Sequence, residues 1–528
     1  MEELIAGVRY SIRSQVVGVI ERCPAVVNSL DLQGNTSAHW AAKKGDLEIL
    51  HLLAENGADL TLPTSADAKM MPIHWAASDG KIAAIRLLLQ RGVDINAQDG
   101  NGCTPVIIAA QHDQATAVAY LVRNGADMAL CDANGDTALH WAAYKGLVEV
   151  VGLLTHCCPQ ALSSDDAFGQ TPLHLAALRG HEEVVEYLVS DCGADTSRLD
   201  KNGVSALDLS LKKGQLKCEW VLRRLTAKSF LDILRGYGSQ RLRDPRILGM
   251  IVFGISEQEW GKWPWRIVFF SNLVGSLVSF DLAMSPALSD LSILHLFNTI
   301  FQCGFWLCFA MCLQKNSAIV RREECGNAAY ESALNQIGNF DSVSMDLPSV
   351  CHTCHVRRPL RSKHCKFQRR CVHKFDHFCP FVYNTVSRDN YKYFFFLLLC
   401  HFCGSVCWMV TIGYLVRRVV ISWSLTAFIL YHLMWFMMIL GLLQYHVALA
   451  SQNLTTNEHL GMQKYAYLRN ELGSLDNPFS KGSVWDNFFD ILNPSSKPFY
   501  SRREVLADKY AVGEKADPSK QKLMAENV

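Results

Sequence analysis

Eight residues in the second half of the chain bring three reactive side-chain types together. The stretch KFDHFCPF, residues 374–381, contains Asp376, His377 and Cys379 within four positions. A histidine can take the proton of a nearby thiol and a carboxylate can orient that histidine, so the trio is typical of an activated sulfur nucleophile. Phe378 stands between the His and the Cys, and a cysteine in an apolar pocket would give the same letters. The surrounding sequence has to separate these two interpretations.

A second group of ligand-type residues lies just upstream. Cys351-x-x-Cys354 is followed by His364 and Cys371. Three thiols and one imidazole at finger-like spacing suit a tetrahedral structural zinc ion. The alternative is a set of scattered surface cysteines in a reducing compartment. We expect zinc, because such a small basic loop has little core of its own and metal binding would supply much of its folding energy.

Long apolar segments flank this loop and predict a membrane domain. Four runs are candidates for spans of about 30 Å of hydrocarbon, at residues 265–284, 291–313, 393–416 and 425–449. The first is the weakest, because Asn272 and Asp281 lie inside it or near its end. An earlier apolar run, 247–255, is too short to cross and is expected to lie at the membrane surface.

Basic residues predict the orientation of the spans. The 314–392 loop is rich in Lys and Arg, whereas the short 285–290 connection has none. Four spans then place both termini and this loop in the cytosol, including the C-terminal tail 450–528. Arg417 and Arg418 in the last hairpin argue against this orientation but are outnumbered. The sequon at Asn453 is therefore expected to remain unglycosylated.

The first half of the chain is a repeat array. Phrases such as TSAHWAAKKG, TALHWAAYKG and TPLHLAALRG begin at residues 36, 71, 104, 137, 171 and 205. This period and the T-P-L-H-x-A pattern predict six ankyrin repeats over residues 31–228. Residues 1–30 are expected to form a helical N-terminal cap, and 229–264 a linker or interfacial segment. Trp40, Trp75 and Trp141 are interpreted as packing between repeats, and the exposed face as a protein-binding surface.

Composition sets further limits on function. The 528 residues contain 51 basic and 50 acidic side chains, which gives no support to nucleic-acid binding. The start MEELIAGVRYSIRS has no signal-peptide h-region, so the 19 cysteines are expected to be reduced. The fold class is thus mainly α, with an ankyrin solenoid before a four-span helical membrane domain that carries a cytosolic zinc-binding loop.

Together these motifs resemble a known family. From residue 351 to 395 the chain resembles the cysteine-rich domain of the DHHC protein S-acyltransferases, or palmitoyltransferases, through CxxC, Ser-x-His-Cys at 362–365 and Asp-His-x-Cys-Pro at 376–380. The ankyrin repeats resemble the ankyrin-bearing branch of that family. Downstream, Thr455-Thr456-Asn457-Glu458 matches its TTxE motif, and the segment around Asn487 matches its C-terminal motif.

The resemblance implies a mechanism and its participants. Cys379 would attack a fatty acyl-CoA, most commonly palmitoyl-CoA, with His377 as general base and Asp376 orienting it. The acyl group would then pass to cysteines of membrane-associated or cytosolic proteins, which the ankyrin repeats would recruit. The resemblance also implies a multi-pass protein in the bilayer, with the Golgi expected first and the ER, vesicles or plasma membrane as alternatives.

Departures from the family pattern concern a second zinc site. In the family this site takes four ligands, and the corresponding positions here are Cys365, Gln368, Phe378 and Thr385. Three of the four ligands are missing, so we expect one structural zinc, with Phe378 filling the vacated site. The alternative function is a catalytically silent, zinc-bound ankyrin scaffold. An ankyrin-bearing cation channel is disfavoured, because four spans without a pore loop do not fit it.

Overall fold

The computed structural model describes residues 1–65, 68–227, 292–314, 319–320, 322–339, 348–365, 368–379, 382, 384–416, 423–470, 473–494 and 497–513. The described residues are mainly helical, as the sequence predicts, with three short β-hairpins. The chain divides into two compact units. The first contains residues 1–259 and 325–357, and the second contains residues 260–324 and 358–528. The linker 229–264 and the apolar runs 247–255 and 265–284 lie outside the described residues.

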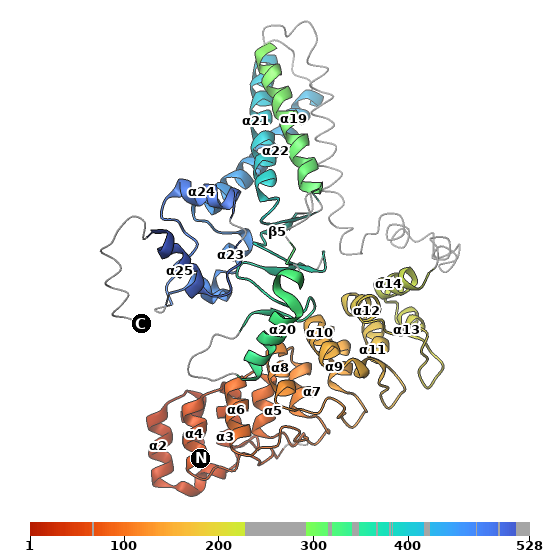
Figure 1. Cartoon of the computed structure of the whole chain (residues 1–528), viewed down its shortest axis with the longest axis vertical. Helices are drawn as coiled ribbons and strands as arrows, with labels where there is room; N and C mark the ends of the chain where they lie inside the picture. Colours follow the sequence, from red (N-terminus) through yellow and green to blue (C-terminus); the bar gives the residue numbers. More distant parts are fainter. Residues whose placement is uncertain are drawn as a thin grey trace. The chain divides into compact units, whose positions relative to one another are not determined.

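The first unit is a stack of antiparallel helix pairs (Figure 1). The stack starts with α1 (Glu2–Arg9), α2 (Arg13–Arg22) and the short η1 (Pro24–Asn28). In the described part of the chain, the ankyrin pairs are α3 (Ser37–Lys44) with α4 (Leu47–Glu55), α5 (Pro72–Ser78) with α6 (Ile82–Gln90), α7 (Pro105–Gln111) with α8 (Ala115–Arg123), α9 (Ala138–Lys145) with α10 (Val148–Cys157), then η2 (Pro159–Ser163), α11 (Pro172–Arg179) with α12 (Glu182–Ser190), and α13 (Ala206–Lys212) with α14 (Leu216–Thr226).

Buried histidines explain why the repeat phrase has its pattern. Thr36 caps α3 and the ring of His39 accepts the Thr36 backbone N–H in return, which forms a capping box. The other ring nitrogen of His39 bonds the carbonyl of Met70 in the next repeat at 2.9 Å. His74 and His140 make the same two contacts one and three repeats further on. Each of these histidines therefore caps the N-terminus of its own helix and forms a hydrogen bond to the following repeat.

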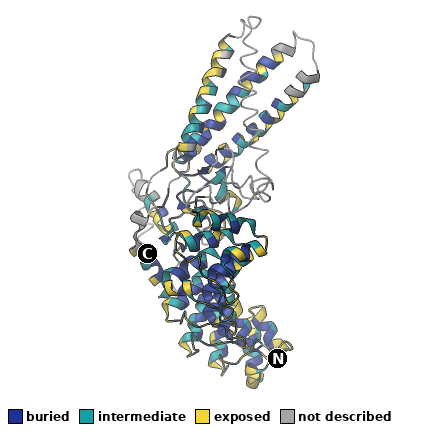
Figure 2. Cartoon of the chain, turned by 90° about the vertical axis from the view of Figure 1, so that its right-hand side faces the viewer, coloured by how far each residue is buried: buried dark blue, intermediate teal, exposed yellow. Residues whose placement is uncertain are grey.

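A continuous apolar core runs through the stack (Figure 2). The small residues Ala41, Ala76 and Ala142 are fully buried and let neighbouring first helices approach closely. The three tryptophans lie at the edge of this core. Trp40 and Trp75 meet edge to face at 5.2 Å between ring centroids, and the indole N–H of Trp141 donates to Asp132. These contacts agree with a packing role for the tryptophans.

The second unit contains the long apolar helices. They are α19 (Ser292–Gln314), α21 (Tyr391–Val416) and α22 (Trp423–Ser451), and α21 packs against both of the others. Two stretches among the described residues are long and apolar enough to cross a membrane, Tyr391–Gly413 and Ile429–Ser451. The apolar stretch of α19, Leu296–Cys312, is shorter. The runs predicted at 291–313, 393–416 and 425–449 are thus helical.

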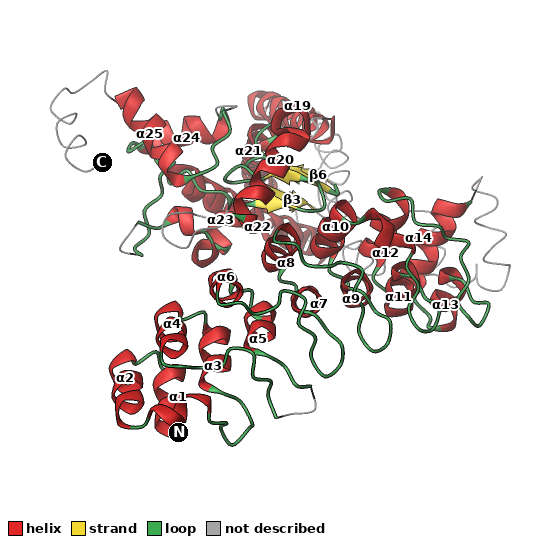
Figure 3. Cartoon of the chain, turned by 60° about the horizontal axis from the view of Figure 1, so that its bottom comes forward, coloured by secondary structure: helices red, strands yellow, loops and turns green. Residues whose placement is uncertain are grey.

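Short hairpins and a C-terminal segment complete the structure (Figure 3). α20 (Arg322–Gly338) precedes the hairpin of β1 (Val350–Cys351) and β2 (Val356–Arg357). β3 (Lys363–Cys365) pairs with β4 (Arg370–Val372), and β5 (His377–Cys379) with β6 (Asn384–Val386), both antiparallel. After α22 come α23 (Thr456–Leu460), η4 (Met462–Lys464), η5 (Ala466–Leu468), α24 (Val484–Leu492) and α25 (Arg502–Gly513).

Candidate active site

Strand β5 arranges the three reactive side chains. Because side chains alternate between the two faces of a strand, His377 and Cys379 share one face and Phe378 points to the other. Cys379 is 3% exposed and belongs to an apolar cluster with residues of α19 and α21. The phenylalanine therefore does not separate His377 from Cys379. Its position between them follows from strand geometry.

A buried carboxylate holds His377 from the opposite side. Oδ2 of Asp376 lies 2.6 Å from Nδ1 of His377, and Asp376 is 1% exposed. Thr456 donates two further hydrogen bonds to this carboxylate, from its backbone N–H to Oδ1 and from its hydroxyl to Oδ2, both at 2.8 Å. Asp376 is thus fixed by the first turn of α23, and its accepting oxygen fixes the tautomer of His377.

Electrostatics favour a protonated His377. Burial alone would lower its pKa, but the Asp376 carboxylate and the Cys379 sulfur both raise it, to about 10. Burial would raise the pKa of Asp376, but its contacts with His377 and the Thr456 N–H hold that pKa below its usual range. At neutral pH the pair therefore carries an imidazolium beside a carboxylate, with Cys379 hydrogen-bonded to the imidazolium.

Aromatic side chains enclose the imidazole. The ring of His377 meets Phe394 edge to face at 5.2 Å and lies 5.9 Å from the ring of His446. His446 comes from α22, is 2% exposed, and shares a hydrogen bond of 3.1 Å with the Tyr391 hydroxyl. The sequence interpretation missed this pair. An ionisable residue inside a membrane-spanning run was the available signal.

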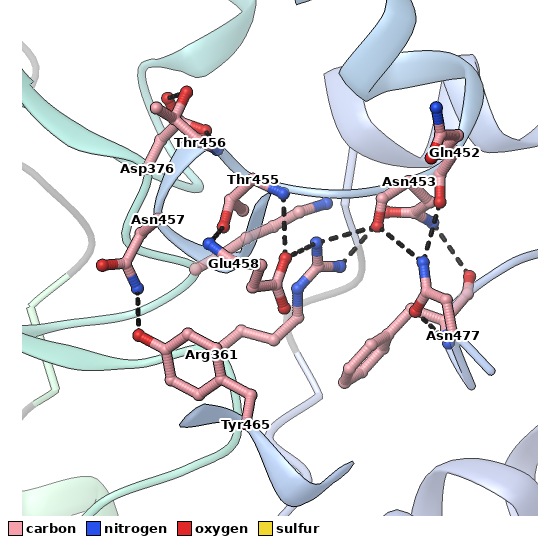
Figure 4. A network of polar contacts seen from close by, with 12 residues as sticks. Arg361, Asp376, Gln452, Asn453, Thr455, Thr456, Asn457, Glu458, Tyr465 and Asn477 are labelled. Atoms are coloured by element: carbon pink, nitrogen blue, oxygen red, sulfur yellow. Dashed lines mark hydrogen bonds and ion pairs between the residues drawn. The ribbon is translucent and has the colours of Figure 1, made fainter. Parts of the chain in front are cut away.

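A buried ion pair joins the loop to the TTxE segment (Figure 4). Arg361 donates to Oε2 of Glu458 at 2.7 Å, and the two side chains are 6% and 1% exposed. The guanidinium also donates to both oxygens of Asn453, at 3.1 and 3.0 Å. Glu458 in turn accepts the Thr455 N–H at 2.8 Å and closes a capping box on α23. The network sets the start of α23, and with it the position of Thr456.

The predicted zinc ligands lie together. Register places His364 of β3 directly opposite Cys371 of β4, and the N–H of Cys354 points at the Cys351 sulfur at 3.4 Å. The ligand atoms of Cys351, Cys354, His364 and Cys371 all lie within 4.8 Å of one another. Three sulfurs and one imidazole nitrogen this close fit a single tetrahedral zinc ion.

The positions of the vacated second site are filled by protein atoms. Phe378 and Thr385 are cross-strand partners, and the Thr385 hydroxyl lies 3.0 Å from the Cys365 sulfur. Phe378 packs on an apolar cluster of Cys365, Val372 and Phe375. Gln368 donates to the side chain of Asn384 at 2.6 Å. Packing and hydrogen bonds thus occupy the place where the family pattern has metal.

Three asparagines of the motifs act as anchors. The amide of Asn384 donates to the carbonyl of Cys312 at the end of α19, at 2.7 Å. Asn390 accepts the Ser387 N–H at 2.8 Å and starts α21. Asn487 of α24 donates to the carbonyl of Ser451 at the end of α22, also at 2.8 Å. These side chains connect the hairpin, the spans and the tail, and Asn384 is also the cross-strand partner of Cys379.

Comparison with known proteins identifies both parts of the chain. Residues 344–463 match the family model of the DHHC palmitoyltransferases, and residues 33–65, 73–161 and 153–229 match ankyrin-repeat models. Palmitoyltransferase ZDHHC17 of Danio rerio is 32% identical over 171 residues, which cover 28% of this chain and 27% of the relative. ZDHHC17 of Homo sapiens is 31% identical over 176 residues, with the same coverage.

Similarity is also found outside animals. Palmitoyltransferase AKR1 of Mortierella alpina is 43% identical over 81 residues, which cover 15% of this chain and 14% of the relative. The matches thus span about a quarter of the length of the ZDHHC17 relatives and less of the fungal one. The resemblance that the motifs indicate is confirmed. The chain carries a domain of the DHHC palmitoyltransferase family together with an array of ankyrin repeats.

Proposed function

We propose that this protein is a membrane-embedded protein S-acyltransferase that uses Cys379 as its nucleophile. The observation that carries the proposal is the shared strand face of His377 and Cys379, with Asp376 bonded to His377 from behind. This arrangement provides a sulfur nucleophile, a group to hold its proton and a carboxylate to stabilise the resulting cation. The match of residues 344–463 to the DHHC palmitoyltransferase family supports the chemical class of the acyl donor, a long-chain acyl-CoA such as palmitoyl-CoA.

The first half-reaction loads the enzyme. The Cys379 sulfur bonds to the carbonyl carbon of the acyl-CoA thioester, and the bond from that carbon to the CoA sulfur breaks. His377 holds the proton released by Cys379 and donates it to the departing CoA thiolate. The raised pKa of His377 supports this role, because a proton already resident on the imidazole leaves Cys379 ready to attack at neutral pH.

The second half-reaction transfers the acyl group to a protein. A substrate cysteine gives its proton to His377 and its sulfur attacks the acyl-Cys379 thioester. Cys379 leaves the acyl carbon as a thiolate beside His377, which keeps the proton taken from the substrate thiol, and this restores the starting state. Asp376 keeps Nδ1 occupied in both steps, so that Nε2 of the ring exchanges the proton.

Zinc has a structural role in this proposal. Cys351, Cys354, His364 and Cys371 would hold one ion, which supplies folding energy to a segment that has only short strands. We expect about one equivalent of zinc per chain by elemental analysis. Two equivalents would contradict the replacement of the second site by Phe378 and Thr385.

A cationic cavity in the second unit supports binding of the CoA phosphates. It has a volume of about 110 Å³ and is lined in part by Lys374, Arg388, Lys481 and Lys497. Burial and nearby Arg361 together lower the pKa of Lys374 to about 7, with Asp490 opposing both. A phosphate group would pair with these cations, which outnumber the two carboxylates of the lining, Asp490 and Asp508.

Membrane placement is part of the proposal. We infer four spans, with the first at residues 265–284, and both termini and the 314–392 loop on the cytosolic side. The Lys and Arg excess of that loop supports this orientation. The Golgi is the proposed location, and the ankyrin array is proposed to recruit substrate proteins with cysteines near the bilayer.

Acyl loading of the purified protein tests the proposal directly. Wild-type chain incubated with labelled palmitoyl-CoA in detergent is expected to gain a hydroxylamine-sensitive label, and Cys379→Ser is expected to gain none. Cys403→Ser is the control, because Cys403 lies in the middle of α21 and not on strand β5 with His377. Equal labelling of wild type and Cys379→Ser would refute the mechanism and favour the scaffold function.

A further inference from the structure

Helix α20 packs on the ankyrin array through one complete face. Tyr330, Ala333, Leu334 and Ile337 follow the i, i+3, i+4, i+7 spacing of a helix face, and all are at most 1% exposed. They belong to the same apolar core as the repeats. Figures 1 and 3 both draw α20 beside α8 and α10, the second helices of the third and fourth repeats. The chain thus covers this part of its own array.

Polar contacts fix the position of α20 on the array. The Glu331 carboxylate accepts hydrogen bonds from Arg123 of α8 and from His156 of α10, the latter at 2.7 Å. Asn124 donates to the carbonyl of Gly338 at the end of α20, at 3.1 Å. Contacts at both ends of the buried face define one orientation for the helix.

The first zinc knuckle, residues 351–355, docks on α10 beside α20. Oε2 of Glu149 accepts the backbone N–H of His352 at 2.7 Å. His355 donates from Nε2 to the carbonyl of Gly152 at 3.1 Å. The ring of His352, 3% exposed, shares a hydrogen bond of 2.8 Å with the Tyr330 hydroxyl. Both helices therefore hold the turn that carries Cys351 and Cys354.

Close approach makes Gly152 necessary at its position. A Cβ atom there would lie 2.7 Å from the carbonyl oxygen of His352 and 3.0 Å from the Cα of Thr353. These neighbours are backbone atoms of the knuckle, which cannot turn aside as a flexible side chain can. Glycine is otherwise a poor choice in a helix interior. Its presence in α10 is explained by the knuckle packed against it.

Backbone strain in the knuckle also indicates that the array supports it. His355 has a φ of 52°, in the left-handed region that side chains other than glycine rarely adopt. Its ring is held by the Gly152 carbonyl and lies 4.6 Å from the ring of His156. Contacts with the array thus stabilise a conformation that the isolated knuckle would disfavour.

We propose that helix α10 of the fourth ankyrin repeat is the outer support of the zinc knuckle, so that zinc binding at Cys351 and Cys354 is coupled to docking of residues 350–357 on the array. The Cys351 thiol also donates to Oε1 of Glu149 at 3.4 Å, and a sulfur that holds zinc would have no proton for this bond. The Glu149 bond to the His352 N–H and the Gly152 contact remain, and they orient the two ligands as outer partners do in metal sites. Partner proteins then have to use other faces of the repeats.

The inference rests on the zinc site of the proposed function but not on acyl transfer. Its test therefore measures zinc affinity and the protection of backbone amides from exchange. Both are measured in the full chain, in a Cys379→Ser background as well as in the wild type. Failure of acyl loading alone leaves these readouts unchanged. If acyl loading is normal but variants of the docking contacts leave zinc affinity unchanged, this inference is overturned and the proposed function is not.

Gly152→Ala is the decisive variant. Alanine favours the helix itself, so weakening can come only from the clash with the knuckle. We expect zinc affinity, measured by competition with a chelator, to fall about 10- to 100-fold, and amide exchange of residues 350–357 to accelerate. Gly18→Ala in α2 is the matched control, because a Cβ there meets no atom within 4 Å. Unchanged zinc affinity and protection in Gly152→Ala would overturn the proposal.

A second pair of variants tests the polar contact. Glu149→Ala removes the acceptor for the His352 N–H and is expected to weaken zinc binding and protection of the knuckle. Glu149→Gln keeps a carbonyl oxygen at the same reach and is expected to restore most of both. Should Ala and Gln behave alike, with zinc affinity equal to that of the wild type, Glu149 does not support the knuckle.

Discussion

Thr456→Val tests how Asp376 is held. Valine keeps the shape of threonine and the backbone N–H bond to Oδ1, and removes only the hydroxyl that donates to Oδ2. That oxygen is the one that contacts Nδ1 of His377. Without the hydroxyl, the carboxylate of Asp376 loses one of its two donors from α23 and His377 is held less firmly.

The magnitude follows from the type of bond. A hydrogen bond to a charged group contributes about 1.5–3 kcal/mol, since the donor is lost while a buried charge remains. If the whole effect falls on the transition state, the rate of acyl loading decreases by about 10- to 150-fold, at roughly 1.4 kcal/mol per factor of ten. The concentration of acyl-CoA at half-saturation is expected to stay the same, because Thr456 contacts the Asp376 carboxylate and none of the cations proposed to bind CoA.

A single-turnover measurement with labelled palmitoyl-CoA checks this prediction. Thr456→Ser is expected to recover most of the rate, because it restores the hydroxyl. Thr455→Val is the neighbouring control: Thr455 caps α23 through the Glu458 N–H, so its loss is expected to lower thermal stability more than rate. A Thr456→Val protein that is folded, zinc-loaded and as fast as the wild type would refute the role of this hydroxyl.

Three further predictions concern charge and burial. Asp376→Asn removes the carboxylate that raises the pKa of His377 to about 10. The alkaline fall in the rate of acyl loading is therefore expected to move down toward neutral pH, which a rate profile from about pH 6 to 9 checks. Arg361→Ala leaves Glu458 as an uncompensated buried charge and is expected to cost about 3–5 kcal/mol of stability in thermal unfolding, with partial recovery in the double variant with Glu458→Gln. Asn453 is fully buried and its amide donates to two acceptors of the C-terminal segment, so the protein from eukaryotic cells is expected to keep its mass after glycosidase digestion.

Regular patterns made much of the fold predictable from sequence. The ankyrin period and the T-P-L-H phrase reflect the capping threonine and the bridging histidine, which recur at the same position in the repeats that begin at residues 36, 137 and 171. The apolar runs at 291–313, 393–416 and 425–449 became helices because hydrocarbon-length segments must satisfy their backbone internally. The ligand spacing from Cys351 to Cys371 also anticipated the cluster, since the hairpin register brings His364 and Cys371 opposite each other.

Contacts between residues far apart in the chain could not be predicted from the sequence. Nothing in the letters relates Arg361 to Glu458 or Thr456 to Asp376, because these pairs are 97 and 80 positions apart and depend on how α23 returns to the loop. The docking of α20 on α8 and α10 was missed for the same reason. Residues 322–338 have a polar composition, and only the spacing of Tyr330 to Ile337 reveals the buried face.

The histidine caps of the repeats make the array acid-labile. Burial lowers the pKa of His39 to about 4, and also lowers those of His74, His140 and His174. At pH values between the ordinary histidine pKa of 6.5 and these lowered pKa values, the unfolded chain binds protons that the folded chain does not. The free energy of unfolding is therefore fully present at neutral pH and is lost as the pH falls. Each such group contributes a slope of up to about 1.4 kcal/mol per pH unit where only the unfolded chain binds the proton. The array is therefore expected to be more stable in surroundings near neutral pH than in an acidified compartment.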